Sequence, residues 1–161
     1  MHTLPAPPFK GMGKLIHIAA WAILFGLPFF FTGRESQTVT VLSYVRSMIV
    51  PLSFMLVFYA NYFVLIDHFL FAKRPWKFLL CNVVLIAASM GAVHLMFELL
   101  PHPEWEHPRP EREWQETVGF FMVNAMLYML VAGLSVAIKM TGSWYQMESS
   151  RRELEKIFAG I

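Results

Sequence analysis

Cysteine is almost missing from this chain, since Cys81 is the only one among 161 residues. A single cysteine excludes an intramolecular disulfide framework and a cysteine-rich metal site. Charge is scarce as well: Asp, Glu, Lys and Arg make up 15% of the residues, whereas soluble domains usually carry about 25%. The formal net charge is only +2, and we expect no nucleic-acid partner.

Sequence signatures of catalysis are also absent. The chain contains no Walker-type glycine loop, no G-x-S-x-G nucleophile and no H-E-x-x-H pair, which are the usual marks of phosphate, acyl and zinc chemistry. We therefore predict no catalytic residue and no cofactor for the chain as it stands. It would be part of an enzyme only if a catalytic domain continued it beyond Ile161.

Long uncharged apolar runs are what the chain has in abundance. Apolar residues make up 57% of the sequence, and a hydrocarbon core roughly 30 Å thick needs about 20 helical residues to cross it. Four runs without Asp, Glu, Lys or Arg have that length: Leu15–Gly33, Ser47–Ile66, Phe78–Phe97 and Thr117–Ile138. The sequence predicts an all-α membrane protein, a four-helix transmembrane bundle. Its parts are a cytoplasmic tail at 1–14, the membrane domain at 15–138 and a helical linker at 139–161.

Lys and Arg are unevenly shared between the two sides of this membrane domain. Nine lie in the N-terminal tail, the loop between spans two and three, and the linker, whereas four lie in the other two loops. Because short cytoplasmic loops carry the excess of Lys and Arg, we predict that both termini face the cytoplasm.

The second outer loop, at 98–116, is acidic and rich in proline. Imidazole and carboxylate groups there suit zinc, nickel or copper, although their spacing matches no established motif. The simpler interpretation, a solvated acidic loop, is the one we favour, and a peptide or cationic ligand is a further possibility. The weak metal-ligand candidates are His94, Glu98, His102, Glu104 and His107.

Polar residues inside the spans are few and uncharged. Asn61 and Asn124 are predicted to be packing anchors, because intramembrane polar side chains tend to face other helices and form hydrogen bonds there. The absence of mid-bilayer charge speaks against an ion-coupled or proton-coupled transporter, in which such residues usually line the path.

The linker carries a stripe of residues at heptad spacing, interrupted by one arginine. Such spacing is typical of a coiled coil, although fewer than three heptads are present. The alternative is an amphipathic helix on the inner membrane surface, with Arg151, Arg152 and Lys156 near anionic lipid. The members of this linker stripe are Met140, Trp144, Met147, Arg151, Leu154 and Phe158.

One segment resembles a known family. The run Tyr59–Phe78, YANYFVLIDHFLFAKRPWKF, resembles the junction of spans two and three in LytS/YehU-like bacterial sensor histidine kinases. There an N-Y-x-x-L-I-P-x-F-L stretch precedes a basic, aromatic inner loop. Asp67 stands where that pattern often has proline. The run Glu148–Ile157 resembles the linker that leads into the kinase core of the same family.

The resemblance implies a sensory membrane domain that relays a rearrangement of its helices through the linker to a kinase. It further implies a location in the bacterial cytoplasmic membrane, with a C-terminal kinase domain and a response regulator as partners. A homodimer in the lipid bilayer is expected as well, because a two-chain coiled coil at the linker needs a second copy. None of the six histidines lies in the P-H-F-L-F-N context of the family's phosphorylated residue, and the ATP-binding boxes are absent. We therefore expect the sensor half alone. The alternatives are a stand-alone membrane scaffold and a transporter or channel subunit.

Overall fold

The computed structural model describes residues 17–26, 41–101 and 114–160. Within these ranges every regular element is helical and no strand occurs, so the predicted all-α class is confirmed there. A helix covers His17–Gly26. The other elements are α2 (Val41–Ala60), the π-helix η1 (Asn61–Leu70), α3 (Pro75–Leu99) and α4 (Trp114–Ala159).

Three helices are long and apolar enough to cross a membrane. They are Val41–Leu70, formed by α2 and η1 with 30 residues, then Pro75–Leu99 with 25 and Trp114–Ala159 with 46. These helices contain the second, third and fourth predicted spans. Of the first predicted span, only His17–Gly26 lies in the part of the chain that the structure describes.

The helices extend beyond the uncharged runs that predicted them. Val41 begins the first of these long helices six residues before Ser47, and η1 continues past Asp67 to Leu70. Helical structure therefore continues four residues past Ile66, the predicted end of the second span. A charged residue marks where the apolar run stops, but the helical backbone satisfies its own hydrogen bonds and continues beyond it.

A tight turn joins η1 to α3. Lys73 has φ 55°, a left-handed conformation that usually favours glycine at the end of a helix. The N–H of Arg74 donates to the carbonyl of Phe69 at 2.8 Å, and that of Lys73 donates to the carbonyl of Leu70 at 3.1 Å. These two bonds form a Schellman motif. Pro75 then starts α3 with a φ suited to the first helical turn.

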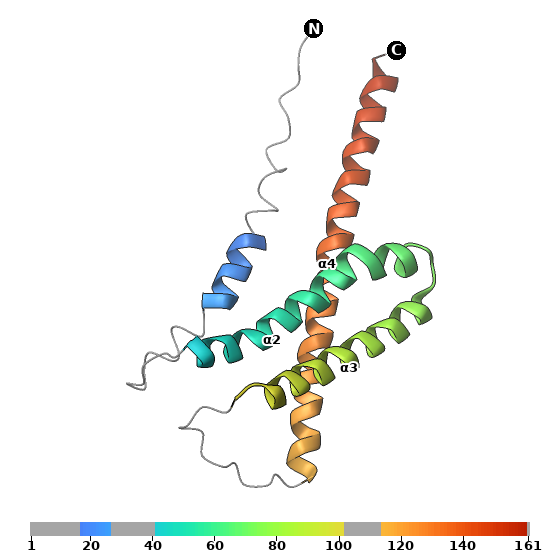
Figure 1. The fold of residues 1–161 in the computed structure, drawn as a ribbon. Coiled ribbons are helices and arrows are strands. Elements are labelled where there is room, and N and C mark those ends of the chain that lie inside the picture. Colours follow the sequence, from blue (N-terminus) through green and yellow to red (C-terminus); the bar gives the residue numbers. More distant parts are fainter. Residues whose placement is uncertain (1–16, 27–40, 102–113, 161) are drawn as a thin grey trace. The chain divides into compact units, whose positions relative to one another are not determined.

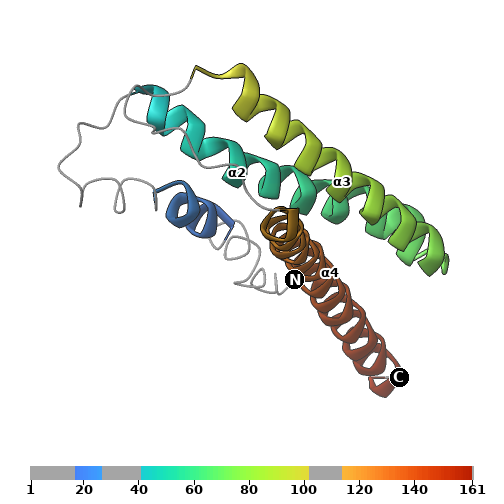
Figure 2. The ribbon, with the colours of Figure 1, turned by 90° about the horizontal axis from the view of Figure 1, so that it is seen from below.

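The chain divides into two compact units between Pro51 and Leu52. In the first unit, the rings of Trp21 and Phe25 lie 6.3 Å apart within their helix. In the second unit, η1 and α3 lie side by side, and α4 packs against both (Figures 1 and 2).

The core of the second unit is small and lies where these helices meet. It is formed by Val57, Ile86, Tyr128 and Ala132, with Phe54, Leu85 and Met90 packed against it. Many other large apolar side chains of α3 and α4 face outward, among them Leu80 at 66% exposure and Leu130 at 67%. So much exposed apolar surface is typical of a protein that meets lipid or a partner.

Candidate functional site: a polar junction between η1 and α4

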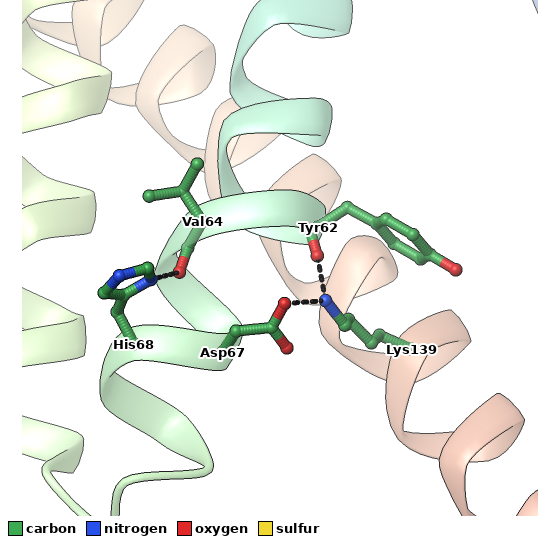
Figure 3. A network of polar contacts seen from close by, with 5 residues as sticks. All are labelled: Tyr62, Val64, Asp67, His68 and Lys139. Atoms are coloured by element: carbon green, nitrogen blue, oxygen red, sulfur yellow. Dashed lines mark hydrogen bonds and ion pairs between the residues drawn. The ribbon is translucent and has the colours of Figure 1, made fainter.

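An ion pair joins the end of η1 to the middle of α4. The Nζ atom of Lys139 lies 2.7 Å from Oδ2 of Asp67. The same ammonium group donates to the carbonyl oxygen of Tyr62 and lies 5.0 Å from the centroid of the Tyr62 ring. Figure 3 shows Lys139 reaching from α4 to both groups on η1.

The two partners differ in their exposure to solvent. The side chain of Lys139 is 15% exposed, whereas that of Asp67 is 47% exposed. A largely desolvated ammonium group is unfavourable unless opposite charge and hydrogen-bond acceptors surround it. Asp67, the Tyr62 carbonyl and the face of the Tyr62 ring supply both. The junction is therefore stabilised mainly because these groups compensate for the desolvation of the Lys139 ammonium.

The π-helical backbone places Asp67 for this contact. Hydrogen bonds between an N–H and the carbonyl five residues earlier define a π-helix, and the bond from Phe71 to Ile66, at 2.9 Å, has this spacing. His68 lies on the side of η1 away from Lys139 (Figure 3), with Nδ1 3.2 Å from the carbonyl oxygen of Val64. Such π-helical turns are rare and frequently occur at functional sites.

Hydroxyl groups flank the apolar core on the side away from the turn at 71–74. Ser53 Oγ and the Tyr128 hydroxyl oxygen lie 2.6 Å apart and share a hydrogen bond. The ring of Phe54 meets that of Tyr128 edge to face, with centroids 4.8 Å apart. These contacts align α4 with the stretch from Ser53 to Asp67, because Ser53 pairs with Tyr128 and Asp67 pairs with Lys139 further along.

A second group of polar residues lies one helical turn from the core toward the turn at 71–74. Asn61 is completely buried, and its amide donates to the carbonyl of Val57 at 3.0 Å. Ser135, also completely buried, donates to the carbonyl of Ala132 at 2.6 Å. On α3, Asn82 donates to Phe78 in the same way. Three buried polar atoms accept or donate no bond within the described residues: Asn61 Oδ1, Asn82 Oδ1 and Ser89 Oγ.

The two predicted polar anchors, Asn61 and Asn124, differ in burial. Asn61 lies in the helix contact, with no exposed surface. Asn124 is only partly buried, and its amide donates to the carbonyl of Phe120 at 2.8 Å within α4. Of these two residues, only Asn61 is therefore completely buried by helix packing.

The weak metal-ligand candidates are only partly described. His94 and Glu98 lie on α3 and are exposed, whereas His102, Glu104 and His107 lie outside the described residues. Within the described ranges, no three His, Cys, Asp or Glu side chains gather in a way that could hold a metal ion. The metal hypothesis therefore gains no geometric support.

All six residues of the linker stripe lie on α4 and are exposed, from 46% for Met140 to 76% for the side chain of Arg151. Arg151 pairs with Glu155 at 3.1 Å, and Arg152 pairs with Glu148 at 3.0 Å. Both pairs lie along the helix surface, so the basic groups of this segment are largely neutralised by their own neighbours.

The Asp67–Lys139 pair was not predicted from the sequence, although a signal for it exists. Asp67 directly follows the second uncharged run and Lys139 directly follows the fourth. Both runs were predicted to end on the same side of the membrane. An acid and a base placed in this way are at the same depth and can pair if the two helices touch.

Comparison with known proteins adds no assignment. The chain matches no family model, no curated protein and no solved structure. The likeness to LytS/YehU-like kinases therefore rests on the sequence motif around Asn61–Leu70 and on the linker.

Proposed function

We propose that this chain is the membrane-embedded sensory and signal-transmitting domain of a bacterial two-component sensor histidine kinase. The observation that carries the proposal is the continuity of α4. Trp114–Ala159 is one unbroken helix that contains the fourth apolar run, the contact with η1 and the linker stripe. A rotation or shift at one end of such a helix is transmitted to the other end.

The linker stripe is rotated away from the face that α4 uses inside its own chain. The packed face carries Tyr128, Ala132, Ser135 and Lys139, with spacings of four, three and four residues. The linker stripe starts one residue later, at Met140, and one residue corresponds to about 100° around an α-helix. A partner on the linker stripe would therefore approach from a different direction and leave the packed face intact.

The continuity of α4 favours a projecting coiled coil over a helix lying on the membrane surface. A surface helix requires a sharp bend directly after the fourth span, and such bends occur at proline, at Gly/Ser pairs or at π-bulges. Helical structure runs through Lys139, Gly142 and Ser143 without a break. Beyond Lys139 the helix extends for about 30 Å. We infer a parallel homodimer along this stripe, with Trp144, Arg151 and Phe158 in one set of core positions.

In this proposal the junction at Lys139 is the point where the membrane domain controls the linker. A stimulus that changes helix packing in the membrane shifts the population between two arrangements. Because Lys139 is bonded to η1 and immediately precedes the linker stripe, a movement of η1 moves the start of the linker. Both termini face the cytoplasm, where a kinase domain after Ile161 would receive the signal and pass it to a response regulator.

Cysteine cross-linking tests the dimer and its face. Cys81 is replaced by serine, and single cysteines are placed at Met140, Met147 and Leu154 on the stripe. Gln146 and Glu153, on another side of the helix, serve as matched controls. We expect disulfide-linked dimers in membranes at the three stripe positions and few at the control positions. Equal yields at all five positions, or none, would contradict the proposal.

A chimera tests the signalling role. The chain is fused after Phe158 to the catalytic core of a histidine kinase, with insertions of four or seven residues at the joint. Seven residues preserve the heptad phase and four do not, so autophosphorylation should survive the first insertion and change in the second. Sequencing the gene in frame beyond codon 161 separates this proposal from a free-standing scaffold, for which an immediate stop codon is expected.

A further inference from the structure

We propose that Lys73, Arg74 and Lys77 form a contact surface for anionic lipid headgroups at the end of the η1–α3 hairpin. This inference uses the membrane placement of the proposed function but not its kinase output. It concerns the turn at 71–77, whose basic residues take no part in the hydrogen bonds and the ion pair of the Asp67–Lys139 junction.

The positive charge of this turn has no counterion in the part of the chain that the structure describes. Asp67 is the only acidic residue between 67 and 77, and it is bonded to Lys139. No carboxylate within the described residues pairs with Lys73, Arg74 or Lys77, and all three are exposed. Three basic groups within five residues therefore face outward and are open to an external anion.

Exposed aromatic rings accompany these charges. Trp76 is 81% exposed and Phe71 is 45% exposed. Tryptophan prefers the boundary between hydrocarbon and headgroups, where its apolar ring and its N–H are both accommodated. The turn also joins two helices of membrane-spanning length. Basic groups beside aromatic rings at the membrane interface can bind the phosphate of a lipid headgroup. Anionic lipids are favoured because their headgroups carry a net negative charge.

The linker helix offers the contrasting case. It also carries three basic residues, Arg151, Arg152 and Lys156, but it carries Glu148, Glu153 and Glu155 among them. Two of these bases form ion pairs along the helix. Its net charge over 148–156 is therefore zero, and its attraction to an anionic surface largely cancels. The geometry favours the turn as the lipid contact.

The test compares two variants of equal charge change. The whole chain is purified in a neutral detergent, stripped of lipid and titrated with phosphatidylglycerol or phosphatidylcholine, and bound lipid is counted by native mass spectrometry. The turn variant is K73Q/R74Q/K77Q, and the linker variant is R151Q/R152Q/K156Q. We expect the unmodified chain and the linker variant to retain phosphatidylglycerol in preference to phosphatidylcholine. We expect the turn variant to bind phosphatidylglycerol at least about tenfold more weakly.

Two controls keep the result interpretable. A K73R/K77R variant changes two side chains but preserves their charge, and it should retain the lipid. If substitution in the turn abolished binding only by misfolding it, this variant would lose the lipid too. Inorganic phosphate should compete poorly, because it lacks the acyl chains that hold the headgroup at the boundary. Equal binding of both lipids, equal loss in the two triple variants, or full competition by phosphate would overturn the proposal. Since no kinase is present, failure of the chimera would leave this result unchanged.

Discussion

The two halves of α4 carry residues at the same three- and four-residue spacing, yet only the first half packs against other described helices of its own chain. Tyr128, Ala132 and Ser135 are buried where α4 meets η1, α3 and the last residues of α2. In the second half, Met147 and Phe158 are more than 70% exposed. One helix thus combines a face that stabilises the chain with a face left open within the described residues, and the two faces should respond separately to mutation.

The largest loss of stability is expected when a large side chain on the packed face is truncated. Replacing Tyr128 by alanine removes a buried ring that contacts Phe54 and a hydroxyl that is bonded to Ser53. We expect the free energy of unfolding to fall by about 3 kcal/mol, measured by SDS-induced unfolding in mixed micelles. Tyr128→Phe keeps the ring and should cost about 1 kcal/mol. Unaltered unfolding of the alanine variant would show that this contact does not stabilise the protein.

A charge on the linker stripe should weaken association between two chains and leave the stability of the packed half nearly unchanged. Leu154→Asp places a carboxylate in the inferred dimer contact, and we expect association to weaken by roughly 2 kcal/mol, or about thirtyfold. Förster transfer between labelled chains in proteoliposomes measures this association. Glu153→Gln, on another side of the helix, is the control and should associate normally. The unfolding of the packed half should stay within about 0.5 kcal/mol of the original; a larger change would mean that the two faces are not separate.

The junction between the two halves should show an intermediate effect. Asp67→Asn leaves the nearly buried ammonium of Lys139 without its counterion, so we expect a loss of about 1–2 kcal/mol in stability, between the values for exposed and buried pairs. Combining Asp67→Asn with Lys139→Met removes both charges and should restore most of that stability. A double-mutant cycle measures the coupling. Additive losses would indicate that the two side chains do not interact in the membrane.

The smallest effect is expected at the turn before α3. Lys73 holds a left-handed backbone conformation that costs a residue with a Cβ atom about 1 kcal/mol. Lys73→Gly should therefore raise the free energy of unfolding by about 0.5 kcal/mol after the greater flexibility of the unfolded chain is subtracted. Lys73→Val should lower it, because a β-branched side chain tolerates this conformation poorly. The same SDS-induced unfolding measurement applies, and identical behaviour of both variants would refute the assignment of strain to Lys73.

Helix positions were well predicted from the sequence, but helix ends were not. The uncharged runs located α3 and the apolar part of α4, because a long apolar run in a membrane protein can satisfy its backbone hydrogen bonds internally as a helix. The ends depend on local backbone chemistry instead. In the turn after η1, Lys73 takes a conformation usually taken by glycine, and after α3 Leu100 takes extended angles directly before Pro101.

Of the candidate site, the sequence indicated the parts and not their pairing. It marked Asn61 as a polar anchor and the linker stripe as a heptad pattern. It did not bring Asp67 to Lys139, which are 72 residues apart, and it did not distinguish Asn61 from the less buried Asn124. Nor did it predict the π-helical backbone of η1, which places Asp67 beside α4.

The sequence by itself determined the all-helical class, the positions of the apolar runs and the charges that follow them, because backbone hydrogen bonds within a helix and apolar run length are local properties. Only the tertiary structure decided which face of each helix is buried. That choice depends on how each helix is rotated about its own axis, and the rotation is set by packing among residues distant in sequence, such as Ser53 with Tyr128 and Asp67 with Lys139.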